Sequence, residues 1–558
     1  MKRLAILLII LAAAILISGC RNKTNEKEKQ LNTFITNHVA KIQPLMKEMN
    51  LASWAASNSG KEADYEKAAG LQLQIRKIYS DANEFGYLKQ TRDSGEIKDE
   101  LLARQLERLY YAYLENQIDP VLMKKIVDLG SKIEQNFSTF RGSIAGKKVS
   151  DNEIRDVLKA STDSAQRQNA WQASKEVGPV VAADLITLVK LRNQAARKVG
   201  FDNYHTMSLA LSEQDVKDVD KIFSQLDALT AEPFEKVKGE LDSQLASMYG
   251  VAVSDLMPWH YHDPFFQESP LVYQIDLDVY YESKNVKDLV AKFYAGIGLP
   301  VDAVIAKSDL YERPGKNPHA FCSDMDKQGD VRVLCNVRDN EQWTETLLHE
   351  LGHSTYAKYN NPKVPYLLRE PAHTFTTEAI AMLMGRLSRD AQWMKDMLNL
   401  SDQEKQRIDD TCKKYAQLKQ LIFARWVLVM YNFEKQLYAN PDQDLNTLWW
   451  DMVEKYQLLR RPANRNSPDW AAKIHFTIAP CYYHNYALGE LLASQLHNHI
   501  VTKVLKNGNA SYVNHKEVGN YLRQNVFEPG AIYEWNTMIE RATGEKLNPQ
   551  YFVEQFVK

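Results

Sequence analysis

The chain has 558 residues, a formal net charge of −2 and 13 histidines. This near-neutral charge argues against nucleic acid as a partner, because proteins that bind nucleic acid carry clustered basic residues. Glycine is scarce, at 23 of 558 residues, and no Pro/Gly/Ser-rich linker or internal repeat occurs after residue 30. We therefore expect one large, mainly α body rather than several small domains.

The first nineteen residues begin with Lys2 and Arg3 and continue as an apolar run, as a secretory signal peptide does. Small residues stand directly before Cys20, which resembles a bacterial lipobox and implies cleavage before Cys20 and a lipid on that cysteine. The alternative is a plain signal peptide with an unmodified thiol. Without residues 1–19 the net charge is −4, since two positive charges leave with them.

A lipid on Cys20 would anchor an exported protein to a membrane, facing the periplasm or the cell exterior, while its body stays soluble. The signal is compatible with either the inner or the outer membrane. Residues 20–30 are charged and lack apolar periodicity, so they are expected to form a tether. Residues 31–558 are then a single domain, and nothing in them requires more than a monomer.

Helices are predicted over most of this domain. Residues 31–140 show the apolar spacing of long amphipathic helices, and another long helix is expected at 218–250, with Gly250 as its stop. Residues 251–315 are rich in proline and aromatic residues and are expected to be irregular. Helices resume at residue 341 and continue to the end.

One segment predicts strands instead. HAFCSDM and VRVLCNV flank residues 326–330 and are typical of a β-hairpin. If Gln328 and Gly329 form a two-residue turn, Cys322 and Cys335 face each other, which predicts a disulfide between them. An exported protein can oxidise such a pair. The alternative is two ordinary strand cysteines.

The stretch HELGH predicts a metal site. Residues four apart share one face of a helix, so His349 and His353 can reach the same ion, and imidazoles are good ligands for zinc. Glu350 lies about a quarter turn away, where it can act on the attacking water without competing for the metal. Glu378, twenty-five residues after His353 in an apolar helix, is the candidate third ligand. A structural salt bridge is its alternative role.

HELGH followed by EAI some two dozen residues later resembles the angiotensin-converting enzyme family of zinc peptidyl-dipeptidases. Further motifs occur in the family's order and extend the resemblance over most of residues 45–490: His319-Ala320, WWDMVEKYQ at 449–457, Lys473-Ile474-His475 and Tyr483-His484-Asn485-Tyr486.

The resemblance implies a two-lobed helical ellipsoid with a deep central groove and a small β-hairpin beside a single zinc ion. N-terminal helices would cover the groove and admit only short, flexible peptides. Cleavage would release dipeptides from a free C-terminus.

The resemblance also assigns roles to single residues. Glu350 is the implied general base, which takes a proton from water and passes it to the leaving amine. The implied donors to the oxyanion are His475 and Tyr486. Lys473 and Tyr483 are implied to hold the substrate's C-terminal carboxylate, and the pair His319-Ala320 is implied to bind substrate along an edge strand.

The sequence departs from the family at several positions. The spacing from His475 to Tyr486 is eleven, one longer than in the family. Keeping the family's spacing would make Asn485 the donor and Tyr482 the carboxylate ligand. We prefer the Tyr-x-x-Tyr register, because tyrosine donates well to an oxyanion and one helical turn relates the pair.

Two partners that the family supplies have no clear match. Met382 replaces an acidic residue, so an outer partner for a ligand histidine is either missing or comes from elsewhere. The family's carboxylate-binding glutamine is best sought within PWHYHDPFFQ, residues 258–267. Two rival functions stay open: an oligoendopeptidase that cuts internal bonds of short peptides, and a catalytically silent peptide-binding lipoprotein. A silent protein is expected to lose Glu350 or a metal ligand, and this chain keeps them.

Chloride activation is not expected. Asn485 and Val453 stand where chloride-activated members of the family carry arginines, and a pocket without those charges holds an anion poorly. We expect turnover to change little when chloride is added at fixed ionic strength. A several-fold rise in turnover would contradict this prediction.

Overall fold

The computed structural model describes the backbone at residues 2–270, 272, 273, 275–508 and 510–557, and side chains from residue 26 onward apart from the same gaps. The predicted signal peptide and the lipidation site at Cys20 lie outside the described side chains. Within the described part of the chain, no helix combines the length and the apolar character needed to cross a bilayer.

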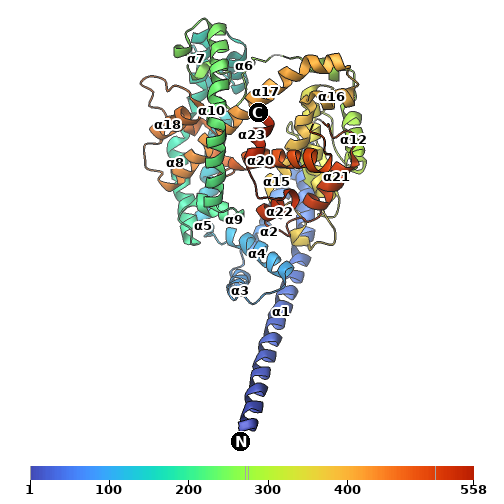
Figure 1. Cartoon of the computed structure of the whole chain (residues 1–558). Helices are drawn as coiled ribbons and strands as arrows, with labels where there is room; N and C mark the ends of the chain where they lie inside the picture. The colour runs from blue at the N-terminus through green and yellow to red at the C-terminus, as the bar shows by residue number, and fades with distance from the viewer. Residues whose placement is uncertain (1, 271, 274, 509, 558) are drawn as a thin grey trace.

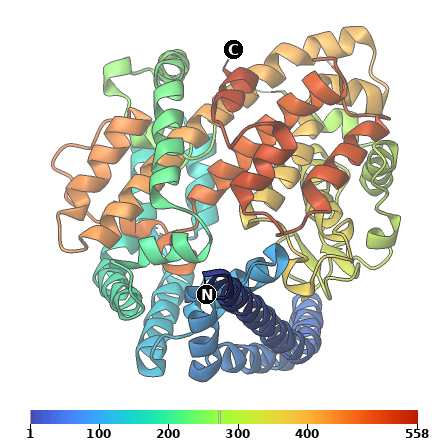
Figure 2. The same ribbon diagram turned by 60° about the horizontal axis from the view of Figure 1, so that its bottom comes forward.

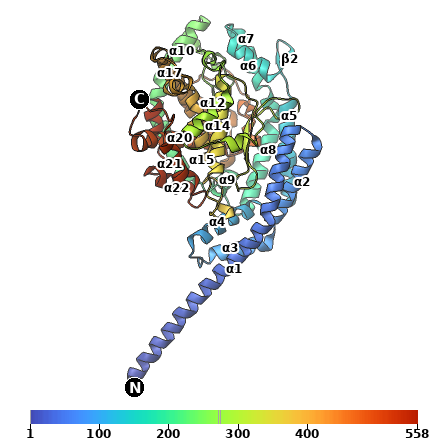
Figure 3. The ribbon, with the colours of Figure 1, turned by 90° about the vertical axis from the view of Figure 1, so that its right-hand side faces the viewer.

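The N-terminal helices form an arm that packs along the body, and Figure 3 shows α1 and α2 side by side. These helices are α1 (Lys2–Ser59), α2 (Glu62–Tyr79), α3 (Ala82–Asp93) and α4 (Glu100–Glu115). Residues 20–30, predicted as a tether, are helical. Lys27 pairs with Glu96 at 2.6 Å, and the Glu28 carboxylate accepts the backbone N–H of Lys98 at 2.8 Å. The folded body therefore begins before residue 31.

Helix α4 is tied to both sides of the molecule. Arg108 pairs with Glu213, in the turn before α10, at 2.8 Å, and it also pairs with Glu370, just before α15. Arg104 donates to the carbonyl of Ala531 at 2.8 Å. The partners are partly buried, which makes these pairs stronger than fully exposed ones, so α4 braces the two sides against each other.

The helices of the body form two lobes, which lie left and right in Figure 1 and are seen from below in Figure 2. One lobe holds the short hairpin β1 (Gly142–Ile144) and β2 (Lys147–Val149), with α5 (Pro120–Thr139), α6 (Asp151–Ala160), α7 (Ser164–Lys175), α8 (Val177–Lys198), α9 (Tyr204–Leu211), α10 (Val216–Tyr249), α18 (Leu445–Gln457) and α19 (His475–Ile478). The other lobe holds β3 (Phe321–Asp324) and β4 (Val331–Leu334), with α11 (Asp278–Tyr281), α12 (Val286–Gly296), α13 (Asp302–Ile305), α14 (Glu341–Lys358), α15 (Thr374–Gly385), α16 (Ala391–Leu398), α21 (Lys516–Leu522) and α22 (Trp535–Thr543).

Helix α17 (Asp402–Ala439) joins the lobes. Its 38 residues span about 57 Å at 1.5 Å per residue. It packs against α16 in one lobe and against α10 and α18 in the other. A capping box between Ser401 and Glu404 fixes its start. The mainly α fold is thus confirmed, with only two small antiparallel sheets among the described residues.

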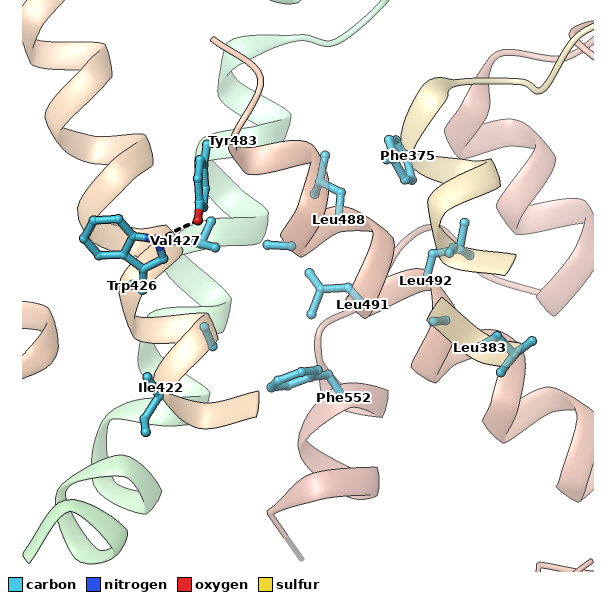
Figure 4. Packing of buried hydrophobic residues seen from close by; sticks show 14 of the residues in the cluster. Phe375, Leu383, Ile422, Trp426, Val427, Tyr483, Leu488, Leu491, Leu492 and Phe552 are labelled. Carbon is cyan, nitrogen blue, oxygen red and sulfur yellow. Dashed lines mark hydrogen bonds between the residues drawn. The ribbon is translucent and has the colours of Figure 1, made fainter. Parts of the chain in front are cut away.

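The centre of the molecule is apolar. Helix α20 (His484–His499) packs between α15, α17 and α23 (Gln550–Phe556). Figure 4 shows the side chains that fill this space: Phe375 and Leu383 of α15, Ile422, Trp426 and Val427 of α17, Leu488, Leu491 and Leu492 of α20, and Phe552 of α23. Fully burying one such side chain stabilises the fold by about 1.5–3 kcal/mol.

Two glycines allow the central helices to approach closely. A Cβ at Gly352 of α14 would lie 2.8 Å from the Cα of Ala381 on α15. A Cβ at Gly489 of α20 would lie 3.3 Å from the Cβ of Glu378 on α15. The backbones of α14, α15 and α20 therefore pack at distances that larger residues would forbid.

The predicted β-hairpin is confirmed, but its predicted register is wrong by two residues. Cys322 faces Val333, and four residues, 326–329, connect the strands. The side chains of Asp324 and Asp326 accept backbone N–H groups within this loop and set its length.

The predicted disulfide between Cys322 and Cys335 is therefore wrong, and both residues are free thiols. Cys335 lies beyond the end of β4, and its backbone N–H donates to Asp309 instead.

The other predicted elements are close to those observed. The helix expected at 218–250 is α10, and Gly250 ends it with φ +63°. The region 251–315 is largely irregular, as predicted, but it contains α12, which the sequence analysis missed. The missed signal is Asn285, whose side chain accepts the N–H of Asp288 as an N-cap.

We expect Gly352→Ala to lower the free energy of unfolding by about 1–3 kcal/mol, because the added methyl group collides with α15. The affinity for the metal should fall as well, since the contact at Gly352 sets the distance between α14 and α15, which carry the ligands. Gly239→Ala is the matched control, because Gly239 lies in the interior of α10 with nothing within 4 Å of the added Cβ. The control should gain up to about 1 kcal/mol. Denaturant unfolding measures both, and a Gly352→Ala protein as stable as the wild type would contradict the prediction.

Candidate active site

Helix α14 presents His349, Glu350 and His353. Its buried leucines fix which face points inward: Leu347, Leu348 and Leu351. The rings of His349 and His353 lie 4.9 Å apart between centroids and are nearly perpendicular. Both imidazoles therefore turn toward the same point, as the spacing of four residues predicts.

Glu378 of α15 lies at that point. Its Oε2 atom is 3.7 Å from Nε2 of His349 and 3.7 Å from Nε2 of His353. Among the described residues, no lysine or arginine pairs with this carboxylate, so a structural salt bridge to such a residue finds no support. Burial raises the pKa of Glu378 to about 6.

The three side chains fit a divalent metal ion. Their ligand atoms all lie within 4.8 Å of one another, so small side-chain rotations bring them to one ion. Burial lowers the pKa of His349 to about 4 and that of His353 to about 3, so both imidazoles are neutral and each has a lone pair for a metal. Two imidazoles and one carboxylate form a ligand set that leaves a position open in a four-coordinate zinc site.

Glu350 lies beside this group, and its carboxylate is buried. Burial, and then the neighbouring charge of Glu378, raise the pKa of Glu350 to about 8, while the backbone N–H of Cys322 on β3 opposes the shift. A cation held by the three ligands would lower this pKa and favour the carboxylate form. The hairpin β3–β4 thus lies next to the candidate base.

An outer partner orients one ligand. Thr377 lies next to Glu378 in the sequence, and its Oγ1 atom is 2.8 Å from Nδ1 of His353. In the neutral ring, Nδ1–H donates to this hydroxyl, which leaves Nε2 free to face Glu378. Thr377 thus provides the outer partner for a ligand histidine that Met382, which replaces an acidic residue, does not supply. The sequence analysis did not identify it.

A cavity of about 610 Å³ lies beside the metal group, and its walls come from both lobes. Its lining residues are Lys159, His262, Gln267, Glu268, Ser269, Met382, Tyr415, Lys419, Gln420, Phe423, His475, Tyr483, Tyr486 and Glu490. Met382 stands one helical turn after Glu378, and the charge of Glu378 raises the pKa of Tyr486 after burial does so. The cavity therefore lies next to the candidate metal site.

Three of the predicted site residues meet in this cavity. The His475 and Tyr483 rings lie 5.1 Å apart, and the Tyr483 and Tyr486 rings lie 5.4 Å apart. Nδ1 of His475 is buried without a hydrogen-bond partner in the described part of the chain. The Tyr483 hydroxyl accepts the indole N–H of Trp426 at 2.8 Å, a bond drawn in Figure 4.

The structure also bears on the choice of register. Asn485 is buried, and its side-chain carbonyl accepts from Gln214 at 2.8 Å. This contact leaves Asn485 off the cavity lining. Tyr482 and Tyr486 are the tyrosines whose pKa the Glu378 charge raises, whereas Tyr483 faces Trp426. The arrangement favours Tyr483 and Tyr486 as the pair in the cavity.

Lys473 lies next to the ring of Tyr483. Its Nζ atom is 5.3 Å from the centre of the Tyr483 ring and donates to Oε1 of Gln267 at 2.5 Å. Gln267 is the last residue of the region in which a carboxylate-binding glutamine was sought. The sequence alone could not choose it, because it and Lys473 stand 206 residues apart.

The remaining candidates are placed elsewhere. His319 is exposed and Ala320 half-buried; they directly precede β3 and do not line the cavity. Strand β3 packs against α14, so the pair lies on the same side of the molecule as the metal group. His260 contacts Ser164 and His262 contacts Tyr249, each at 2.8 Å, and His262 also lines the cavity.

The fold and this site are those of a metallopeptidase, and known proteins agree. The family described as "Angiotensin-converting enzyme" matches residues 25–260, and "Peptidase family M3" matches residues 306–558. The two matches cover both parts of the chain, which is therefore similar to both of these metallopeptidase families.

Two curated relatives are similar over most of the chain. An "Inactive angiotensin-converting enzyme-related protein" of Caenorhabditis elegans is 22% identical over 513 residues, which are 81% of this chain and 54% of the relative. "Angiotensin-converting enzyme" of Theromyzon tessulatum is 20% identical over 433 residues, 71% of this chain and 69% of the relative. The chain thus spans about half the length of the nematode protein.

We expect Thr377→Val to weaken zinc binding by roughly 10–100-fold, because His353 loses the partner that fixes its orientation. Competition with a chelator of known affinity measures this change. Thr374→Val is the matched control, since Thr374 lies on the same helix, is exposed and is no part of the metal group. Equal affinity in the two variants would show that the contact does not orient His353.

Proposed function

We propose that the protein is a zinc peptidase that releases dipeptides from the free C-terminus of short peptides. The observation that carries this proposal is the group formed by Lys473, Gln267 and Tyr483: Gln267 and Tyr483 line the cavity next to the metal group, and Lys473 donates to Gln267. A carboxylate-binding group at a fixed distance from the reacting bond selects a fixed number of residues from the C-terminus.

Lys473 is suited to bind an anion. The residue is 7% exposed, and burial lowers its pKa to about 8. Among the described residues its ammonium forms no ion pair, and the hydrogen bond to Gln267 involves an uncharged partner. A buried cation without a counterion is costly, and a substrate carboxylate would offset that cost.

His349, His353 and Glu378 would hold the zinc ion, which when bound supplies Lewis acidity to water and to the scissile carbonyl. Glu350 then takes the proton of the attacking water and passes it to the leaving amine. His475 and Tyr486 donate hydrogen bonds to the oxygen that becomes negative, and a donor of this kind contributes about 2.7–4 kcal/mol.

The proposal extends to where the protein acts. The apolar start of the chain and the small residues before Cys20 support export and a lipid anchor on that cysteine. A monomer held at a membrane surface would meet peptides in the periplasm or outside the cell. The size of the cavity supports short, flexible peptides as substrates.

A second candidate function is an oligoendopeptidase. It is favoured by the match of residues 306–558, which include every metal ligand, to peptidase family M3. A catalytically silent peptide-binding lipoprotein is the third, and the nematode relative is described as inactive. The intact set of His349, Glu350, His353 and Glu378 speaks for activity in this chain.

Digestion of three samples separates these functions: a nonapeptide with a free C-terminus, the same peptide amidated, and the free peptide with Glu350→Gln. We expect the wild type with zinc to release dipeptides from the free acid alone. Glu350→Gln should bind zinc and lose at least roughly 100-fold in kcat, because the general base is gone. Mass spectrometry of the products decides. Internal cuts in both peptides would establish the oligoendopeptidase, and zinc binding without cleavage would establish a silent protein.

Variants of the carboxylate group sharpen the test. Lys473→Met and Gln267→Leu should raise KM for the free acid and reduce the preference for free acid over amide. Lys419→Met is the matched control, because Lys419 lines the same cavity but contacts Glu345 rather than Gln267. A preference for the free acid that survives in Lys473→Met would remove this lysine from the role.

A further inference from the structure

The segment that carries His475 has little structure of its own. Helix α19 is four residues long, His475–Ile478, and an irregular stretch follows before α20 begins at His484. So short a helix leaves most of its carbonyl groups without partners inside the helix. Its position must therefore be set by contacts from other elements.

Arg192 of α8 supplies one set of contacts. Its guanidinium donates to the carbonyl of Phe476 at 2.8 Å and to that of Thr477 at 2.6 Å. It also donates to the Tyr438 hydroxyl at 3.1 Å. The residue is 7% exposed, and a planar guanidinium that makes several bonds is held in one orientation. Arg192 thus holds the backbone of α19 at Phe476 and Thr477 without lining the cavity itself.

Glu434 of α17 supplies the other contact. Its carboxylate accepts the backbone N–H of Cys481 at 2.8 Å. Cys481 has φ +55°, a left-handed conformation that non-glycine residues adopt only when their surroundings impose it. This bend directs the chain into Tyr482 and Tyr483. Glu434 is 4% exposed, and the charge of Arg192 acts on its carboxylate, so the two residues lie near each other behind the segment.

We propose that Arg192 and Glu434 are positioning residues that hold residues 475–483 and thereby set His475, Tyr483 and Tyr486 in the cavity. Neither residue lines the cavity, so each acts through the residues it holds. The inference rests on the proposed function where it concerns catalysis, and on the hydrogen bonds alone where it concerns the position of the segment.

Hydrogen exchange read by mass spectrometry tests the position without any assay of activity. In the full chain, Arg192→Met and Glu434→Met should speed exchange at least tenfold in peptides that contain residues 476–483, and leave α14 and α15 protected. Glu434→Gln keeps an acceptor oxygen and should exchange like the wild type.

The matched control is Arg167→Met. Arg167 is fully buried and also donates to two backbone carbonyls, those of Ser161 and Trp259, at 2.9 and 2.8 Å. It should leave residues 476–483 protected. Unchanged exchange of this segment in both Arg192→Met and Glu434→Met would overturn the inference.

Peptide cleavage tests the consequence for catalysis. We expect Arg192→Met and Glu434→Met to lower kcat at least roughly tenfold, with normal zinc content, because small displacements of donors are costly. Glu434→Gln should stay within about threefold of the wild type, as a conservative rescue. In a background that carries both His475→Ala and Tyr486→Phe, Arg192→Met should cost less than about threefold more, since both donors that it positions are already removed. A full tenfold loss in that background, or an equal loss in Arg167→Met, would make the role of Arg192 merely structural and overturn the inference.

The two failures are distinguishable. A wild-type protein that cleaves no peptide would refute the proposed function, and the exchange data would still decide whether Arg192 and Glu434 hold the segment. An active wild type whose kcat does not depend on either residue would refute the positioning inference and leave the proposed function intact.

Discussion

The close crossing of α14 and α15 at Gly352 is the contact on which the site depends. A side chain at this position would meet the backbone of Ala381, so only the absence of one lets the two helices approach as they do. That approach brings the carboxylate of Glu378 to 3.7 Å from both imidazoles. Gly489 allows a similar close approach on the next helix, where α20 packs against the Cβ of Glu378. The backbones of α14 and α15 are thus in direct contact, and α20, which carries Tyr486, packs closely on the side chains of Glu378 and Met382.

The site gathers buried groups that can carry a charge. Burial raises the pKa of both Glu350 and Glu378, and the charge of Glu378 raises that of Glu350 further. Lys473 is buried next to Gln267, which lines the cavity, and it forms no ion pair among the described residues. Such groups are expensive in a folded protein unless a ligand compensates them. A cation at one end of the cavity and an anion at the other would satisfy all three, which is the arrangement that a peptidase specific for a free C-terminus requires.

Both lobes contribute walls to the cavity, and α17 connects the lobes and packs against each of them. It carries Trp426, which donates to Tyr483, and Glu434, which accepts from Cys481, while its other end packs on α16 in the opposite lobe. Movement of one lobe against the other would therefore change the cavity walls. The ion pairs of Arg108 on α4 add a second brace between the lobes, from the side of the N-terminal arm.

The sequence by itself determined whatever depends on neighbouring residues. The helical period places His349 and His353 on one face, and the apolar run around Glu378 marks an acidic residue that needs a partner. The tertiary structure decided the rest. Gln267 and Thr377 have partners that no local pattern names, because a distant element supplies each one. The predicted register of the hairpin was wrong for a different reason. Side-chain hydrogen bonds of Asp324 and Asp326 lengthened the turn, shifted the register by two residues and separated Cys322 from Cys335. Periodicity follows from the geometry of the backbone and can be read from the chain, whereas pairings across the fold follow from packing and cannot.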